Sequence, residues 1–494
     1  MESNWFDSKG NFISRREFVG KISFLSLLTL MSCGSDLDIS QETVKKVSEK
    51  VPDEIFESAI LNALCWRDGK WKPTHVGIRK DATIFISEVP LMASNIIDAG
   101  KKILSPGFID ILADNALEPK STWSIFEKYK LTDGCTTALQ MHGGSPDCLD
   151  FYNHFSKKKH FINYGVSTFV MELRNSISDL NQRLMAVEKN LDNGALGVSH
   201  SIEYQPTEYQ EILSYAKLAS KYKRPFFMHL RYSDEKHELD GVKEAIRIAR
   251  EANVHVHMNH LHSTGGTYNM PKALELINEG INSGLSLSCC IYPFSYWATY
   301  LPSKRFDEGW KERYKITYRD LTVVGTGETL TPESFAKYRK GLNRLVAVPE
   351  GTMDLSKTVD LALKESFCMI GSDGGIESEP RANNHPRGAS CFSTALRHGI
   401  SIGIPLEKML EKMTLLPKKL IGSPMEKRGV LKNGFVADLV LIDINKVAGK
   451  ASVANPNQFS DGIEAVWVNG KLAYKDKKLM DTPGMAIKYE SRVA

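Results

Sequence analysis

Eight short apolar segments separated by helical stretches constrain the fold of this chain more than any other feature. Between positions 242 and 252, for example, apolar residues fall on one helical face: Val242, Ala245, Ile246 and Ala249. Alternating strands and helices are typical of a parallel sheet, and eight such units close a (β/α)8 barrel. The predicted strands are Leu104–Ile111, Thr136–Met141, Gly165–Glu172, Ala195–Ile202, Pro225–Arg231, Val254–His262, Leu285–Pro293 and Phe367–Gly374.

Chemically competent side chains lie at the ends of several of these predicted strands, where a barrel of this kind carries its functional groups. Zinc takes about four ligands from His, Asp, Glu and Cys, and a catalytic zinc leaves one position for water. We therefore predict Glu172, His229 and His260 as metal ligands. Asp373 is the predicted general base, which would pass a proton from water to a leaving amine.

Two of these residues have structural alternatives that the sequence leaves open. Glu172 could instead form an ion pair with Arg174 or Arg231. Asp373 lies in a Gly-Ser-Asp-Gly-Gly segment, and Asp and Gly are also typical of turns. The neighbouring His255, His257 and His262 are interpreted as structural histidines that alternate across their strand.

The segment Ser105–Asn115 reads Ser-Pro-Gly-Phe-Ile-Asp-Ile-Leu-Ala-Asp-Asn and resembles the Pro-Gly-Phe-(Ile/Val)-Asp-x-His-x-His segment of the amidohydrolase superfamily. Further motifs resemble its N-acyl-D-amino-acid deacylase (D-aminoacylase) branch, among them Phe227–Arg231, Asn259–Leu261, Gly371–Gly374 and His385–Arg387. The resemblance extends from about Ile60 to Lys475. It implies an amidohydrolase (β/α)8 barrel with a small β-sandwich built from both chain ends.

The same resemblance implies an activity and further site residues. The reaction would be hydrolysis of a C–N amide bond other than a peptide bond, in a small molecule such as an N-acyl-D-amino acid. Arg387, Tyr292 and His385 would bind this substrate. Arginine suits a carboxylate because its planar guanidinium can form two parallel hydrogen bonds, although Arg387 could also form a loop salt bridge.

The chain departs from the family pattern at the expected metal site. Leu112 and Asp114 replace the two histidines of the first strand, and the cysteine expected after the second strand falls at His142-Gly143-Gly144. A later Phe-Pro-Arg segment is replaced by Phe392-Ser393-Thr394. N-acetylglucosamine-6-phosphate deacetylases, which also have altered first-strand histidines, use one metal held by a strand-three glutamate and two histidines. We therefore predict one zinc ion, or another divalent metal, per chain.

The predicted domain organisation follows from these segments. Residues 57–104 and 421–494 form the β-sandwich, and residues 105–420 form the barrel. Residues 296–343 interrupt the alternation with charged and aromatic residues and no clean strand. This insertion could be a lid over the barrel mouth or a plain surface insertion.

The N-terminus resembles an export signal rather than part of the fold. Ser14–Lys21 contains Arg15-Arg16 in a twin-arginine context, and the apolar run Ile22–Met31 that follows is short for a membrane span. The subsequent Leu-Met-Ser-Cys-Gly resembles a lipobox with Cys33 as the lipidated residue. We expect a signal peptide over residues 1–33, a tether over 34–56, and a membrane-anchored lipoprotein on the periplasmic or cell-surface side. An uncleaved N-terminal anchor is the alternative.

Composition excludes several other classes of protein. The net charge is +4 in 494 residues, and no basic run is interleaved with aromatic residues, which argues against nucleic-acid binding. The eight cysteines form no Cys-x-x-Cys pair, so neither a zinc ribbon nor a disulfide scaffold is indicated. The favoured function is an exported amide hydrolase, and the alternatives are a catalytically inactive barrel that binds a related ligand and a surface scaffold.

Overall fold

The computed structural model describes residues 54–117, 122–341, 344–349, 353–376 and 384–490. Contacts divide the chain into two compact units, with the boundary after Leu104. Lys432–Val436 returns to the N-terminal unit, and all other residues from Ser105 onward form the second. The predicted signal peptide, including Cys33, lies outside the described residues. None of the helices in the described ranges is long and apolar enough to cross a membrane.

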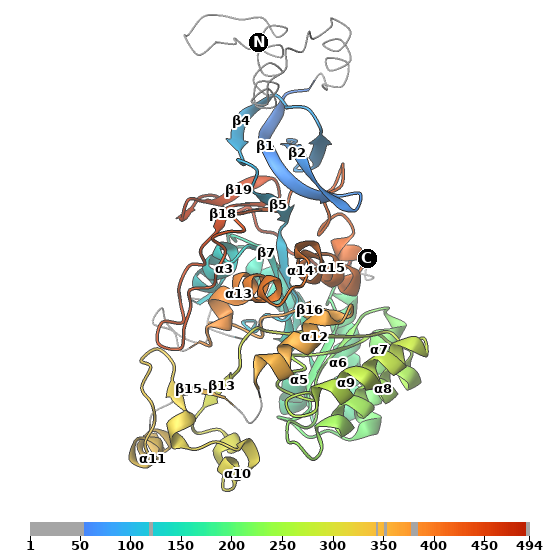
Figure 1. Cartoon of the computed structure of the whole chain (residues 1–494). Coiled ribbons are helices and arrows are strands. Elements are labelled where there is room, and N and C mark those ends of the chain that lie inside the picture. Colours follow the sequence, from blue (N-terminus) through green and yellow to red (C-terminus); the bar gives the residue numbers. More distant parts are fainter. Residues whose placement is uncertain (1–53, 118–121, 342–343, 350–352, 377–383, 491–494) are drawn as a thin grey trace, which may run out of the picture. The chain divides into compact units, whose positions relative to one another are not determined.

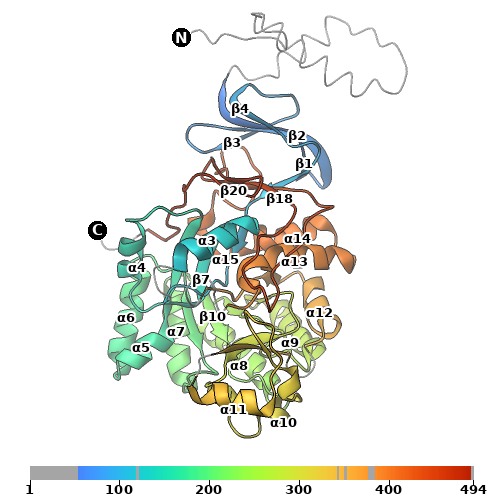
Figure 2. The ribbon, with the colours of Figure 1, turned by 90° about the vertical axis from the view of Figure 1, so that its left-hand side faces the viewer.

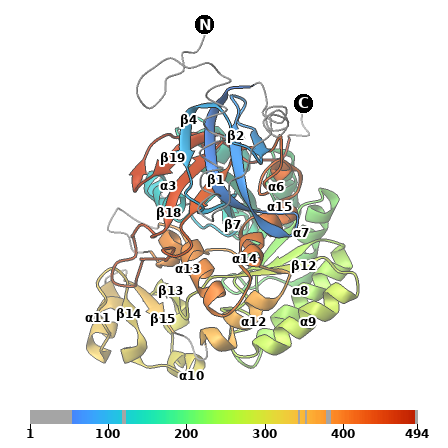
Figure 3. The same ribbon diagram turned by 45° about the horizontal axis from the view of Figure 1, so that its top comes forward.

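The N-terminal unit is a small β-structure whose strands are visible in Figure 3. It contains β1 (Phe56–Arg67), β2 (Lys70–Ile78), β3 (Ile84–Ser87) and β4 (Ala93–Asp98). β1 and β2 form an antiparallel hairpin, and β4 pairs in parallel with β1. The late segment Lys432–Val436 joins this unit, where the Ile84 amide donates to the Phe435 carbonyl at 2.8 Å. The unit is therefore built from two distant parts of the chain.

The second unit contains an eight-stranded parallel sheet, which confirms the predicted fold class (Figure 1). Neighbouring strands follow the order β16-β12-β11-β10-β9-β8-β7-β6. Every predicted barrel strand overlaps an observed one. The observed strands are β6 (Phe108–Asp110), β7 (Cys135–Ser145), β8 (Asn163–Phe169), β9 (Val198–Ser201), β10 (Phe226–His229), β11 (Val256–Met258), β12 (Leu287–Ile291) and β16 (Cys368–Ile370).

The first and last strands meet just beyond their ends. Ala113 and Gly374 form a parallel bridge, and the Ser372 amide donates to the Asp110 carboxylate at 3.0 Å. Gly375 is required by this close approach, since a side-chain carbon there would lie 1.8 Å from the Asp114 carbonyl oxygen. The closure brings Asp114 and Asp373 to the same end of the barrel.

Helices cover the outside of the barrel, and successive helices α6 to α9 pack side by side (Figures 1 and 2). The predicted apolar face between positions 242 and 252 is confirmed, because all four of its residues are buried in α8. The helices around the sheet are α3 (Trp123–Thr132), α4 (Cys148–Phe155), α5 (Val170–Ser176), α6 (Leu180–Asp192), α7 (Tyr209–Lys221), α8 (Glu238–Ala252), α9 (Met270–Asn282), α12 (Val359–Lys364), α13 (Arg387–Ser401), α14 (Leu406–Met413) and α15 (Leu415–Ile421).

The insertion after β12 has a core of its own, so the expectation that it lacks clean strands is wrong. It contains β13 (Trp297–Tyr300), β14 (Thr322–Val323) and β15 (Leu345–Val348), joined in a three-stranded sheet. The helices α10 (Trp310–Tyr314) and α11 (Pro332–Gly341) accompany this sheet. Phe306, Trp310 and Phe335 belong to its apolar cluster. The strands have two to four residues each, too short to show a clear alternation of apolar and polar residues.

The last part of the second unit forms β17 (Leu439–Ile442), β18 (Ile463–Val468), β19 (Lys471–Lys475) and β20 (Lys478–Leu479). They pair antiparallel in sequence order, as the strand and turn pattern predicts.

The seven cysteines in the described ranges are buried with free thiols. Both a zinc ribbon and a disulfide scaffold are therefore absent from this part of the chain.

Candidate active site

Three histidines from separate strands meet at the C-terminal end of the barrel. They are His142 in β7, His229 at the end of β10 and His260 just after β11. One nitrogen from each lies within 4.8 Å of one nitrogen from each of the others. A second group, formed by Asp114, His142 and Asp373, meets the same criterion. The two groups share His142 and together offer three imidazoles and two carboxylates.

The atoms of this cluster suit a divalent metal. The Nδ1 atom of His229 is buried and has no hydrogen-bond partner among the described residues. Burial lowers the pKa of His229 and lowers that of His260 well below the usual value, which favours the neutral imidazole that can ligate a metal. Imidazole nitrogen and carboxylate oxygen are donors that zinc accepts in tetrahedral sites.

His142 lies between two carboxylates. Its Nδ1 atom is 3.3 Å from Asp114 Oδ2, and its Nε2 atom is 3.4 Å from Asp373 Oδ1. Burial alone would lower the pKa of His142, but Asp373 and Asp114 together outweigh burial and raise it to about 9. The two carboxylates thus favour a positive charge here: His142 carries it as a proton near neutral pH, and a metal ion bound at this position would displace that proton.

Asp373 has a backbone conformation that is uncommon for residues other than glycine. It follows β16 with φ of 49°, in the left-handed region, and His260 also has a positive φ of 31°. Such conformations persist where surrounding contacts fix them, and they cluster at functional sites. The Asp373 carboxylate lies 2.8 Å from Arg387 Nη2 and 4.0 Å from His260 Nε2.

Arg387 is placed to bind a second anionic group. It begins α13, and its guanidinium lies over the Tyr292 ring at 4.4 Å from the ring centroid. Its Nε and Nη1 atoms are buried without a hydrogen-bond partner among the described residues. Buried donors of this kind are costly unless a ligand satisfies them, so the geometry suits a carboxylate.

Two predicted site residues lie elsewhere. Glu172 is in the first turn of α5, where its Oε1 atom accepts a hydrogen bond from Asn175, and it does not join either metal-binding group. His385 uses both ring nitrogens on the backbone, with Nε2 at 3.0 Å from the Tyr296 carbonyl and Nδ1 accepting from the Arg387 amide at 3.0 Å. The predicted ligand set with Glu172 does not converge, and His385 supports Arg387 and the start of the insertion.

The cluster opens into a cavity of about 310 Å³, which is the size of a small-molecule site. The predicted residues His229, His260 and Asp373 line it together with Tyr292 and Arg387. The insertion supplies one wall through Trp297, Ala298, Thr299, Tyr300, Arg305 and Leu345. The insertion thus forms part of the cavity wall, and its role as a lid stays a prediction.

Sequence reasoning missed three polar residues of this site. His142 and Asp114 stand where the family pattern has a cysteine and a histidine, and comparison with that pattern alone indicates the loss of two ligands. Imidazole and carboxylate are themselves zinc ligands, so the residue types of His142 and Asp114 could have identified them as candidate ligands. Glu203, in the loop after β9, accepts a hydrogen bond from His229 Nε2 at 2.9 Å, and no motif identified it.

Comparison with known proteins agrees with this geometry. The model of the Amidohydrolase family matches residues 128–473. N-acyl-D-glutamate deacylase from Alcaligenes xylosoxydans xylosoxydans is 25% identical over 86% of this chain and 95% of its own length. The crystal structure of N-acyl-D-glutamate deacylase from Bordetella bronchiseptica, complexed with zinc and a phosphonate inhibitor, has a TM-score of 0.75 at 22% identity, covering 88% of this chain and 100% of that one. A D-aminoacylase structure, described in terms of a binuclear metal centre with one-metal activation and second-metal attenuation, has a TM-score of 0.73 at 22% identity with the same coverages. The strand order, the convergent site and the family match together show that this chain belongs to the amidohydrolase family.

Proposed function

We propose that this chain is a metal-dependent hydrolase that cleaves the amide bond of an N-acyl-D-amino acid. The observation that carries the proposal is the convergence of three imidazoles and Asp373 in one cavity beside Arg387, whose Nε and Nη1 atoms have no hydrogen-bond partner among the described residues. Similarity to N-acyl-D-glutamate deacylase supports the substrate class. The same relatives support dependence on a metal.

In this proposal His142, His229 and His260 would hold one zinc ion. These residues offer three nitrogen donors, and a catalytic zinc held by three protein ligands would remain open to water or substrate. Bound zinc would supply Lewis acidity, which polarises the amide carbonyl and lets water attack near neutral pH. His142 replaces Glu172 in the ligand set expected from the sequence, and Asp114 lies beside it as a further carboxylate.

Asp373 acts as the general base. It takes a proton from the attacking water and delivers it to the amide nitrogen, so that the C–N bond breaks to give a carboxylic acid and a free amine. Arg387 binds the α-carboxylate of the substrate through its two unsatisfied donors, with Tyr292 packed against the guanidinium. The amide then lies between this anchor and the imidazoles.

An amidase assay tests the proposal. The purified chain is incubated with zinc and with matched N-acetyl-D- and N-acetyl-L-amino acids, and release of free amino acid is measured. Turnover of a D-substrate is expected in the wild type, and Asp373→Asn serves as the blank. Zinc-loaded wild type that hydrolyses neither series would rule the enzyme out and leave a ligand-binding barrel.

We also propose that the chain is exported by the twin-arginine route and anchored through a lipid on Cys33. The support is the order of Arg15-Arg16, the apolar run and the lipobox-like segment at the start of the chain. Mass spectrometry of the membrane-extracted protein tests this directly. The expected wild-type product begins at a lipidated Cys33, and the Cys33→Ser variant should lack the lipid. A wild-type protein that keeps residues 1–33 and carries no lipid would instead indicate an uncleaved anchor.

A further inference from the structure

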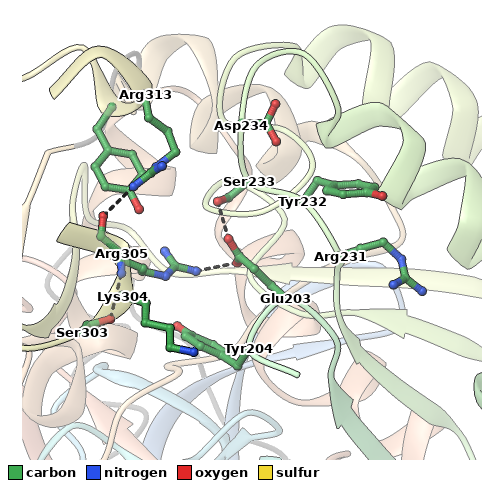
Figure 4. Close-up of a pocket in the computed structure, with 11 residues that line it drawn as sticks. Glu203, Tyr204, Arg231, Tyr232, Ser233, Asp234, Ser303, Lys304, Arg305 and Arg313 are labelled. Atoms are coloured by element: carbon green, nitrogen blue, oxygen red, sulfur yellow. Dashed lines mark hydrogen bonds and ion pairs between the residues drawn. The ribbon is translucent and has the colours of Figure 1, made fainter. Parts of the chain in front are cut away.

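A chain of three polar side chains connects the insertion to a candidate metal ligand. His229 Nε2 lies 2.9 Å from Glu203 Oε2, and Arg305 Nη2 lies 2.5 Å from the same oxygen. The Ser233 hydroxyl donates to the other oxygen, Glu203 Oε1, at 2.6 Å. Figure 4 shows Glu203 held between Ser233 and Arg305. The three members of the chain come from the end of β10, the loop after β9 and the insertion.

The carboxylate of Glu203 determines which nitrogen of His229 can bind a metal. An ionised carboxylate only accepts hydrogen bonds, so His229 Nε2 must carry the proton in this contact. The lone pair is then on Nδ1, which is the buried atom without a hydrogen-bond partner among the described residues. Carboxylates that accept from a ligating histidine fix its tautomer and ring orientation, and their loss weakens metal binding about 10–100-fold.

Arg305 in turn fixes Glu203 from the insertion. Its guanidinium lies over the Trp297 ring at 4.6 Å and the Tyr204 ring at 5.0 Å, and its side chain is only 12% exposed. Arg305 and Tyr204 line both the cavity that holds the imidazoles and a second cavity of about 400 Å³. The contact between Arg305 and Glu203 therefore joins the wall made by the insertion to the barrel strand that carries His229.

We propose that Glu203 and Arg305 are positioning residues through which the insertion sets the affinity of the metal site. This inference rests on the metal ligands assigned in the proposed function. The insertion is then more than a cover for the substrate, because its Arg305 holds the carboxylate that orients His229. Removing the charge at either position frees the imidazole to rotate or to change tautomer, and zinc binds less tightly.

A neighbouring ion pair provides a matched control. Arg231 lines the second cavity and pairs with Glu244 at 2.7 Å, with side chains 18% and 14% exposed. This is comparable to the burial of Arg305 and Glu203 at 12% and 20%. Among the described residues, the Arg231–Glu244 pair forms no hydrogen bond or ion pair with His229, His142 or His260. Variants of this pair therefore remove a half-buried ion pair near the cavity but leave the contact between Glu203 and His229 in place.

The experiment measures zinc dissociation constants of the full chain by competition with a chromophoric chelator. Glu203→Gln is expected to weaken zinc binding about 10–100-fold and Arg305→Gln about tenfold. Glu244→Gln and Arg231→Gln are expected to change it less than about twofold. Thermal melts in the presence of a chelator report folding of each variant, and Arg305→Gln remains informative if Glu203→Gln does not fold.

The outcomes separate this inference from the proposed function. Wild-type affinity in both Glu203→Gln and Arg305→Gln overturns the positioning role, as does an equal loss in the control pair. Wild type that binds zinc but hydrolyses no N-acyl amino acid overturns the proposed activity while the positioning role stands or falls on the affinities alone. Wild type that binds no zinc overturns both.

Discussion

Two polar clusters lie a few residues apart at the closure of the barrel, and they differ in how completely their atoms are satisfied. In the closure cluster, Lys130 Nζ lies 2.8 Å from Asp110 and 2.7 Å from the Ser372 hydroxyl, and all these bonds are buried. In the site cluster, made of Asp114, His142, His229, His260 and Asp373, a buried imidazole nitrogen has no partner within the described part of the chain, and two residues have left-handed backbone angles. A satisfied buried cluster stabilises the fold, whereas buried polar atoms without partners are suited to binding a ligand.

Asp373→Asn gives the largest expected effect, and it falls on activity. The amide keeps the shape of the carboxylate but cannot take a proton, so kcat should fall about 10²–10⁴-fold. The melting temperature should change by only a few degrees, because the amide oxygen of Asn can still accept a hydrogen bond from Arg387 Nη2. Assay of amino-acid release beside a thermal melt checks both. A retained kcat would remove Asp373 from the role of base.

Lys130→Met is expected to reduce the stability of the fold, whereas Asp373→Asn is expected to reduce activity. The substitution leaves the buried Asp110 carboxylate uncompensated, which costs about 3–5 kcal/mol. Urea unfolding measures this loss. Lys128→Met on the same helix is the control, since Lys128 is only half-buried and contacts the Tyr129 and Phe459 rings. Equal destabilisation by both variants would contradict the special role of the closure cluster.

The buried carboxyl of Asp133 should make the stability of the fold depend on pH. Burial raises the pKa of its carboxyl to about 6 from 3.8, although Ser393, Ser460 and the Phe392 amide donate to it. Because the folded-state pKa is raised, its contribution to stability is present below about pH 4 and is lost as the pH rises through about 6. This loss amounts to about 2–3 kcal/mol.

In Asp133→Asn that pH-dependent contribution should disappear. The free energy of unfolding of the wild type minus that of the variant is therefore expected to decrease between about pH 4 and pH 6. Urea unfolding at a series of pH values measures it. A difference that stays constant over this range would show that the buried carboxyl does not titrate there.

Arg387→Lys should have the smallest effect of the set. Lysine keeps the charge but loses the paired donors, so KM for an N-acyl amino acid should rise about tenfold, or about 1.4 kcal/mol, while kcat changes less. Steady-state kinetics of the two enzymes measure this split. An unchanged KM would assign the carboxylate to another residue.

The fold could be predicted from the sequence because apolar strands and amphipathic helices repeat along the chain. All eight barrel strands and the buried face of α8 follow from that periodicity. The short strands of the insertion do not, since β14 has two residues. Their stability comes from the aromatic cluster around Phe306, Trp310 and Phe335, which only the folded chain brings together.

The site was only partly accessible to sequence reasoning. His229, His260 and Asp373 follow their strands directly, and the structure places all three in the cavity. Glu172 was expected at the end of a strand, but β8 ends at Phe169 and α5 begins at Val170, which directs the side chain away. The contact of Glu203 with His229 depends on the path of a loop, which no local pattern specifies.

The surroundings of Leu112 disfavour a histidine at this position of the first barrel strand. It is fully buried in an apolar cluster with Met141, Phe227 and Cys290. A histidine restored at this position would exchange hydrocarbon contacts for a buried imidazole with no polar neighbour in that cluster, at a cost of about 1–3 kcal/mol. Recovering the first-strand ligand would therefore require coordinated substitutions in several strands. Other members with this altered centre should be recognisable by an apolar residue in place of the first histidine together with a histidine in place of the cysteine.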